Sequence, residues 1–420
     1  MLETIKNFVW SAPVVINLAL FGVAVLIKTK GYTFFRLPSI LKDTVFKIKK
    51  SRKSFAMMCT SLGGTIGVGN AIGVAGALTE GGAGAVFWMG IAGILGMAIK
   101  YAEIFLALTY KTPGIKSYGP MAYIEKGTGT KFFAVIYAFL CVCVSLGMGN
   151  LAQVKSAISA FDGIFSIPEF VLSGIIVIVF FRVVIGGIKK ISSFSEIAVP
   201  VISLVYIFSL LFVLFKFREN VPNAIRGILS GTGLMTGVKW AVIKKGITSG
   251  FSKAIFSSEA GLGSVGFAHT SSDTDPHEQG KWGVVEVFVD AVICIMTSIA
   301  ILTLSKEISG VPTSYMTRAV FAYSMGVWGE IFYGVSMTLF AFASLLCWFY
   351  NGSTAVEYIT KKKSVSNFYC LLFGVIIFAS AFIKDCVIID LSDIANGVMM
   401  TMNLCCLWLI LFKNTLTFNL

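Results

Sequence analysis

The sequence has 420 residues, of which 56% are hydrophobic and 13% are charged, and its formal net charge is +13. A soluble domain carries about 25% charged residues. This composition, with a mean hydropathy of +0.85, excludes an ordinary soluble protein and predicts an integral protein of the lipid bilayer. Apolar runs of about 20 residues predict spanning helices rather than a barrel. The positive charge then indicates basic cytoplasmic loops and gives no reason to expect nucleic acid as a partner.

The cysteines and histidines form no recognisable metal or redox motif. Most of the nine cysteines lie inside apolar runs, and neither His269 nor His277 has a metal-ligand spacing with them. We therefore expect structural thiols, without a disulfide framework or a metal site of that kind. The N-terminus lacks a basic region followed by a small-residue cleavage site, so no removable signal peptide is expected.

Residues 12–28 form the first apolar span, and a basic connector follows it. Between residues 28 and 53 this connector holds nine basic residues and one acid, Asp43. By the positive-inside rule the connector is cytoplasmic and the N-terminus is outside. Residues 1–54 are thus predicted to be an N-terminal spanning helix with its cytoplasmic connector.

The second span is rich in glycine between Thr60 and Gly84, where the sequence reads TSLGGTIGVGNAIGVAGALTEGGAG. Each glycine in a helix interior costs roughly 1 kcal/mol against alanine. The pattern predicts two half-helices with an unwound joint near Gly63–Asn70. Such a joint offers free N–H and C=O groups, with Thr65 and Asn70 beside them, as ligands for an anion and a cation. The alternative is close helix packing through small residues.

Four further spans are expected at about 83–110, 131–160, 168–188 and 193–216, and residues 55–216 are predicted to be one five-helix repeat. The next connector, 217–237, should lie outside and contain a short surface helix. Its arginines Arg218 and Arg226 are an exception to the positive-inside rule.

A second interrupted stretch lies at residues 247–267, where glycines flank the polar run Ser257-Ser258-Glu259. Spans are expected after it at about 282–304, 328–359, 368–384 and 396–412. Residues 238–412 are predicted to be the second repeat, and 413–420 a cytoplasmic tail.

The count gives eleven spans, and without the first one ten remain. The interrupted spans are then the first and sixth of a five-plus-five arrangement. Because five is odd, the two halves have inverted topologies. Paired broken helices at matching positions of inverted repeats indicate the binding site of a secondary transporter.

Several segments along residues 55–410 resemble the signature of the alanine/glycine:cation symporter family. They read GGTIGVGNAIGVA, GGAGAVFWM, GMAIKYAE, YGPMAYIEKG, GMGNLAQ, GGIKKI, FSSEAGLGS, FAFASLLCW and DLSDIANGVMMTMNL. The resemblance implies an all-α LeuT-like fold of the amino acid–polyamine–cation superfamily. It also implies uptake of alanine, glycine or similar small neutral amino acids across the cell membrane. Sodium is then the coupling ion, and no organic cofactor is expected.

The sequence departs from that family pattern at three places. The family usually reads GNIxGV where this chain has Asn70-Ala71-Ile72, FSNEAG where it has Ser258, and FAFST where it has Ala343-Ser344. Ser258 and Ala343 each remove a polar group near the expected site. Substrate choice and cation stoichiometry are therefore left open by the sequence.

A zwitterionic amino acid needs donors for its carboxylate and acceptors for its ammonium group. Half-helix N-termini supply the former and half-helix C-termini the latter. Partly by similarity to the LeuT-like fold, we expect the carboxylate near Thr65, Gly67 and Gly69. The ammonium is expected at the carbonyls of Phe256, Ser257, Ser258 and Glu259. Gln153 either closes the site or makes an interhelical hydrogen bond.

Sodium prefers hard oxygen ligands, and the resemblance implies a set made of backbone carbonyls and one hydroxyl. This set contains Gly63, Gly64, Ile66 and Ser344. A packing role for the Ser344 hydroxyl is the alternative. Trp348 lies four residues later on the same helical face, where it either limits the size of the pocket or packs in the core.

Glu259 is an ionisable residue within a span and is therefore a functional candidate. It can contact the ammonium, bind sodium or brace the unwound backbone, and we favour the brace, with Lys253 as a partner. Lys100 and Glu103 are three residues apart and predict an ion pair on one helical face. Glu286 and Asp290, four apart, predict either a proton or gating pair or, as the commoner outcome, solvated or interhelical contacts.

The leading hypothesis is sodium-coupled symport, and the alternative on the same fold is proton-coupled or exchange transport. Few carboxylates other than Glu259 lie near the expected site, which argues against a proton relay. No filter motif indicates a channel, no clustered nucleophile or base indicates an enzyme, and no Walker-type loop indicates ATP as the energy source. The oligomeric state cannot be inferred.

Overall fold

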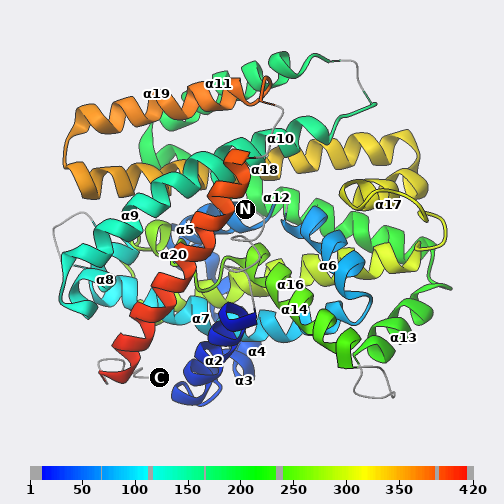
Figure 1. The fold of residues 1–420 in the computed structure, drawn as a ribbon, viewed down its shortest axis with the longest axis horizontal. Helices are drawn as coiled ribbons and strands as arrows, with labels where there is room; N and C mark the ends of the chain where they lie inside the picture. The colour runs from blue at the N-terminus through cyan, green and yellow to red at the C-terminus, as the bar shows by residue number, and fades with distance from the viewer. Residues whose placement is uncertain are drawn as a thin grey trace.

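The computed structural model describes residues 12–67, 69–111, 117–164, 167–232, 240–383 and 387–413. Within these residues the regular structure is entirely helical, as the long apolar runs predict (Figure 1). The first part of the chain contains α2 Ala12–Lys28, α3 Tyr32–Phe35, α4 Leu37–Thr44, η1 Val45–Lys50, α5 Arg52–Thr65, η2 Gly69–Gly73, α6 Val74–Gly81, α7 Ala85–Thr109, α8 Pro120–Thr128, α9 Lys131–Leu146, η3 Gly147–Leu151, α10 Ala152–Ser159, α11 Glu169–Val184 and α12 Gly187–Lys216. The second part contains α13 Val221–Gly231, α14 Trp240–Ser258, α15 Val265–His269, α16 Pro276–Thr303, η4 Thr313–Tyr315, α17 Met316–Met325, α18 Val327–Thr360, α19 Lys363–Ala379 and α20 Val387–Phe412.

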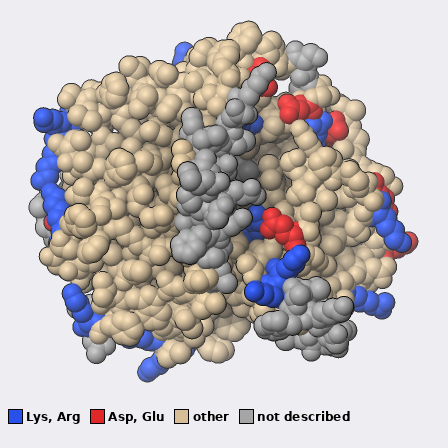
Figure 2. All heavy atoms as spheres, in the orientation of Figure 1, with Lys and Arg blue, Asp and Glu red and all other residues tan. Residues whose placement is uncertain are grey.

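Six of the described helices are long and apolar enough to cross a membrane, and the number is seven if one bent helix pair counts as a single span. Most of the face in Figure 2 carries neither sign of charge, as expected of a surface that meets lipid. Further apolar helices such as α2 and α19 are shorter. The count of eleven spans, the orientation of the termini and the predicted domain boundaries therefore stay predictions.

Both interruptions predicted from the glycines are present. The axis bends by 52° between Arg52–Thr65 and Gly69–Gly81. The joint is shorter than the predicted Gly63–Asn70, because α5 continues as a helix through Gly63 and Gly64 to Thr65. Val68 lies outside the described residues. In the second broken span, α14 ends at Ser258 and α15 begins at Val265.

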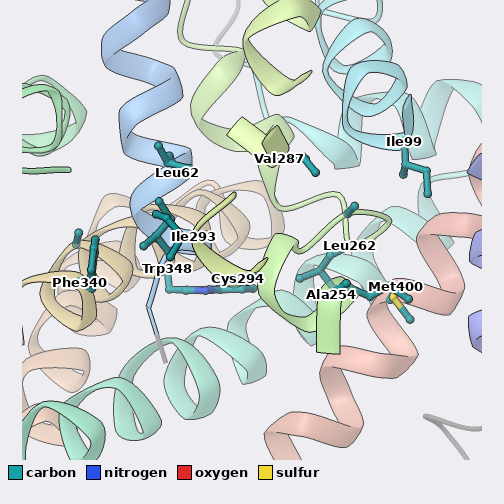
Figure 3. Close-up of a cluster of buried hydrophobic side chains, with 14 of the residues drawn as sticks. Leu62, Ile99, Ala254, Leu262, Val287, Ile293, Cys294, Phe340, Trp348 and Met400 are labelled. Atoms are coloured by element: carbon teal, nitrogen blue, oxygen red, sulfur yellow. The ribbon is translucent and has the colours of Figure 1, made fainter. Parts of the chain in front are cut away.

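The core forms around α7, which packs along α14 and α16 (Figure 1). Small residues permit this approach, since a Cβ on Gly93 would lie 3.2 Å from that of Ala291. Figure 3 shows side chains of the same buried cluster, among them Leu62 of α5, Cys294 of α16 and Trp348 of α18. The ends of both broken spans are therefore enclosed by protein, where irregular backbone is tolerated at membrane depth.

The span predicted at 131–160 contains a third irregularity, which the sequence did not indicate. Residues Gly147–Leu151 form a π-helical turn between α9 and α10. The absence of a side chain at Gly149 is required, because a Cβ there would lie 2.3 Å from the Cβ of Trp348. This turn brings Trp348 of α18 against the segment that carries Gln153.

Candidate substrate and cation site

The first break is held by a side chain that replaces a lost helical bond. Ile66 is extended, with φ −77° and ψ 114°, so the helix cannot continue. The N–H of Gly67 donates to Oδ1 of Asn70 at 2.9 Å, and the N–H of Asn70 donates to the carbonyl of Gly67 at 3.2 Å. Asn70 thus satisfies a donor freed by the unwinding, and in this conformation its amide oxygen bonds the protein itself.

The two breaks meet at Gly69. A Cβ on Gly69 would lie 3.1 Å from the Cα of Ser257, at the end of α14. Next to it, a Cβ on Gly67 would lie 3.5 Å from Oε1 of Gln153. The structure therefore brings Gly67 and Gly69, the end of α14 and Gln153 together, as the sequence predicts. Their role in binding stays a prediction.

Asp290, which the sequence paired only with Glu286, lies between the two broken spans. Its Oδ1 accepts hydrogen bonds from Nδ2 of Asn70 at 2.7 Å and from Oγ of Ser257 at 2.8 Å. The thiol of Cys294 is 3.3 Å from each of these two donors. Asp290 is only 3% exposed, so this carboxylate is buried against neutral donors. A buried charge of this kind is costly without an opposite charge.

Glu259 begins the second break in a left-handed conformation, with a φ of 53°. Its carboxylate accepts hydrogen bonds from Oγ of Ser264 at 2.6 Å and from Nε1 of Trp348 at 3.1 Å. In the described part of the chain, Glu259 therefore bonds side chains around the second break and not its backbone N–H groups, so the brace favoured from the sequence is wrong for this residue. Lys253, predicted as its partner, instead lies 3.6 Å from Glu80 of α6, because α14 turns that side chain toward the other broken span.

Side chains from three helices, α7, α9 and α20, hold the unwound residues Gly261–Gly263. Gly261 and Gly263 have positive φ angles of 91° and 84°. Oε1 of Glu103 accepts from the N–H of Gly263 at 2.9 Å and from Nδ2 of Asn403 at 2.7 Å. Nδ2 of Asn403 also donates to the carbonyl of Gly261 at 2.8 Å. The hydroxyl of Tyr137 donates to the carbonyl of Leu262 at 2.7 Å. The brace on this backbone is thus Glu103, not Glu259.

The carboxylate of Glu103 is consequently not paired with Lys100 as the sequence predicted. Lys100 forms its ion pair with Glu286 of α16, and Oε1 of Glu286 also accepts from Oγ of Ser61 at 3.0 Å. Oε2 of Glu286 lies 3.5 Å from Nε2 of His269. Lys100 and Glu103 lie on one face of α7, but each bonds a partner on another helix, Glu286 of α16 and Asn403 of α20. Glu286 and Asp290 each make contacts with other helices, which is one of the alternatives predicted from their spacing.

Part of the predicted cation set is assembled around Gly64. Its carbonyl accepts from Oγ of Ser344 at 3.2 Å. Gly63 packs against Ala343, since a Cβ on Gly63 would lie 3.1 Å from that of Ala343. Ser344 and the end of α5 thus lie together with hard oxygen atoms, which suits sodium, and the departure at Ala343 leaves a methyl group at this contact.

The remaining predicted residues take different positions in the site. Phe256 is half-buried in the last turn of α14, where a helix leaves carbonyls without intrahelical partners. Oγ of Ser258 accepts from the N–H of Ala260 at 3.4 Å. Nε2 of Gln153 donates to the carbonyl of Met148 at 3.2 Å, whereas its buried Oε1 has no hydrogen-bond partner in the described part of the chain. An unpartnered buried acceptor near Gly67 is suited to an ammonium group.

Comparison with the models of known protein families identifies the family of this chain. The model of the sodium:alanine symporter family matches residues 1–418. The chain belongs to the sodium:alanine symporter family. As a member of this family it is a membrane transporter and not an enzyme, and family membership supports sodium-coupled symport of an amino acid.

Individual relatives are similar to this symporter over most of its length. An uncharacterised transporter of Haemophilus influenzae is 33% identical, over 96% of this chain and 92% of the relative. The sodium/alanine symporter AgcS of Methanococcus maripaludis is 30% identical, over 96% of this chain and 93% of the relative. A probable sodium/glutamine symporter of Bacillus subtilis, GlnT, is 28% identical, over 96% and 87%. The named substrates of these relatives differ.

Solved structures show the fold of the symporter. MhsT in complex with L-phenylalanine is similar with a TM-score of 0.55 at 16% identity, over 86% of this chain and 92% of that structure. A Na⁺-coupled sialic acid symporter in a substrate-bound outward-open state is similar with a TM-score of 0.58 at 13% identity, over 90% and 82%. The LeuT-like fold predicted from the sequence is thereby confirmed.

Two glycines of η2 provide a matched test of the contact between the breaks. Gly69→Ala places a Cβ 3.1 Å from the Cα of Ser257, while Gly73→Ala meets nothing within 4 Å. We expect Gly69→Ala to lower the initial rate of amino-acid uptake by about tenfold, because small displacements of a binding geometry are costly. Gly73→Ala should retain the parental rate. Equal rates for both variants would contradict a functional contact at Gly69.

Proposed function

We propose that this symporter takes up small neutral amino acids, with alanine and glycine as the preferred substrates, and that the inward movement of sodium down its gradient drives the uptake. The observation that carries this proposal is the close approach of the two broken spans at Gly69 and Ser257. Trp348 packs against Gly149 and donates to Glu259 beside them. Little room is thereby left for a long side chain, which favours alanine over glutamine as the substrate.

The substrate assignment rests on polar groups that the breaks release. The carboxylate is bound near Thr65, Gly67 and Gly69, at the start of the half-helix that follows the first break, where the N–H of Gly67 is already taken by Asn70. The ammonium group is bound by the last carbonyls of α14 and by Oε1 of Gln153, which is buried without a partner among the described residues. Half-helix ends supply the matching dipoles. Asn70 acts here as a support for the joint, since its amide oxygen accepts from the N–H of Gly67.

The sodium assignment rests on two groups of oxygen atoms. One contains the carbonyls of Gly63, Gly64 and Ile66 with the hydroxyl of Ser344, which is 3.2 Å from the Gly64 carbonyl. The other contains the carboxylate of Asp290 with Ser257 and Asn70 around it. Sodium supplies the positive charge that the buried Asp290 carboxylate lacks. A cation at Asp290 would also contact both broken spans through Asn70 and Ser257, so its binding favours the conformation that holds the substrate.

Transport of radiolabelled alanine into proteoliposomes tests the proposal. We expect accumulation above equilibrium with an inward sodium gradient, and none with equimolar potassium. Unlabelled glycine should compete, whereas glutamine should compete at least about tenfold less well, as a pocket that excludes a longer side chain implies. Liposomes without protein serve as the control.

Three results would contradict parts of this proposal. Accumulation driven equally well by a proton gradient would favour the proton-coupled alternative, with Glu259 as the first residue to test. Exchange of internal for external alanine without net accumulation would favour an exchanger. Efficient uptake of glutamine would contradict the size argument made from Gly69 and Trp348.

A further inference from the structure

Arg218 and Arg226, the exceptions to the positive-inside rule, line one groove on the surface of the molecule. The groove lies between the end of α12 and the start of α13 and has a volume of about 600 Å³. In Figure 1, α13 lies at the edge of the helical bundle. The two arginines are separated in the sequence by the turn that joins these helices, so it is the fold that brings both charges to the same groove.

No acidic residue in the described part of the chain forms an ion pair with either arginine of this groove. Within the described residues, neither guanidinium has an ion pair or a side-chain hydrogen bond, although Arg218 lies over the ring of Phe215 at 5.3 Å. A guanidinium group binds phosphate through two parallel hydrogen bonds. Two such groups on one groove therefore favour a ligand with a phosphate.

The other walls of the groove are apolar. They consist of Leu211, Leu214, Phe215, Val221, Pro222 and Ile225. Several of these side chains are well exposed, with Phe215 at 69% and Leu211 at 47%. A free phosphate ion gains nothing from such walls, whereas a hydrocarbon chain gains about 25 cal/mol for each Å² of apolar surface that is buried.

The groove lies at the end of an apolar span, which is the level at which the surface of a bilayer is expected. The apolar span Gly187–Lys216 ends just before Arg218, so we place Leu211 on the hydrocarbon side and Arg218 on the headgroup side of the bilayer boundary. The neighbouring Lys216, whose Nζ donates to the carbonyl of Ser324 at 2.7 Å, also marks the end of the span. Basic and aromatic side chains are characteristic of this level in membrane proteins.

We propose that this groove is a binding site for one anionic phospholipid. Arg218 and Arg226 bind its phosphate, and one acyl chain lies against the apolar walls formed by α12 and α13. The site is separate from the substrate site and does not depend on which amino acid is carried. Because α13 also packs against α16, which carries Asp290, a bound lipid stabilises the outer end of the helix that holds the proposed cation ligand.

Lipid titration of the purified, detergent-solubilised full chain by native mass spectrometry tests the site. The probes are a phosphatidylglycerol and a phosphatidylcholine with the same acyl chains, and soluble glycerol 3-phosphate. We expect the first phosphatidylglycerol to bind selectively. Arg218→Gln/Arg226→Gln should weaken it by about thirtyfold, since each basic residue near a membrane surface contributes about one kcal/mol of attraction.

The matched control is Arg182→Gln/Lys189→Gln, which removes two exposed positive charges at the junction of α11 and α12, at the opposite end of α12 from the groove. This variant should bind the first phosphatidylglycerol as the parent does. Equal binding by the Arg218→Gln/Arg226→Gln variant, or equal retention of phosphatidylcholine by the parent, would overturn the proposal. Binding of glycerol 3-phosphate as tight as that of the lipid would overturn it too, because the apolar walls would then play no part. Thermal unfolding confirms that each variant is folded.

Discussion

Asp290→Asn is expected to lose most of the sodium response of alanine uptake. Asparagine keeps an Oδ1 atom that can accept the hydrogen bonds of Asn70 and Ser257, now 2.7 and 2.8 Å long, but it removes the charge. Interactions with charged groups contribute about 1.5–3 kcal/mol each, so the sodium concentration for half-maximal uptake should rise by about a hundredfold. Initial uptake rates measured across a series of sodium concentrations, with choline as the replacement cation, give this value.

The same variant has a second, independent signature in its stability. Removal of a buried charge should raise the unfolding temperature in sodium-free buffer, while addition of sodium should stabilise Asp290→Asn less than the parent. Asp273→Asn is the matched control, because Asp273 lies in the exposed loop before α16. A hydrogen bond from Lys53 lowers the pKa of Asp273, so this control also removes an ionised carboxylate. Parental sodium dependence in Asp290→Asn would exclude Asp290 as a cation ligand.

Lys100→Met is expected to destabilise the symporter strongly, by about 3–5 kcal/mol, because it leaves the Glu286 carboxylate buried without its cation. Both side chains are essentially inaccessible, with exposures of 1% and 0%. The double variant Lys100→Met/Glu286→Gln should recover most of the loss. Glutamine at this position is neutral and retains an acceptor for Oγ of Ser61, which now lies 3.0 Å from Glu286. Unfolding midpoints in detergent measure the order of the three proteins.

An exposed ion pair on the same chain provides the comparison. Lys47 pairs with Asp43 at 2.6 Å, with side-chain exposures of 52% and 36%. Lys47→Met should change the stability by less than about 1 kcal/mol, because water and salt screen such pairs. If Lys100→Met were as stable as Lys47→Met, the buried pair would contribute nothing, and its role as a fixed contact between α7 and α16 would be wrong.

The buried polar contacts fall into two groups with different structural roles. Glu103, Asn403 and Tyr137 bond the unwound backbone at Gly261–Gly263 directly and so fix its shape. Within the described ranges, the carboxylate of Asp290 instead accepts hydrogen bonds from side chains of the two broken spans, Asn70 and Ser257. A ligand at Asp290 can therefore change the relation between the spans while the second break keeps its own conformation, which is what coupling of a cation to a substrate requires.

The motifs along the chain resembled those of the family, which the family model confirms. The sequence by itself also determined the membrane class and the positions of the two broken spans. These properties depend on local features, namely the length of apolar runs, the crowding of glycine near Gly63–Asn70 and the polar run Ser257-Ser258-Glu259. Glycine weakens a helix wherever it occurs, and a long apolar run crosses a membrane whatever its neighbours are. These predictions therefore needed no knowledge of which helices touch.

Only the tertiary structure decided which buried polar groups are partners. Lys100 pairs with Glu286, 186 residues away, rather than with nearby Glu103. Glu103 bonds Asn403, 300 residues away, and Asn70 bonds Asp290 across 220 residues. Helical spacing predicts that two side chains on one helix can meet, but it cannot show that a neighbouring helix offers a closer or better charged partner. In a buried setting each charge must find such a partner, so the packing of α7, α16 and α20 fixed these contacts.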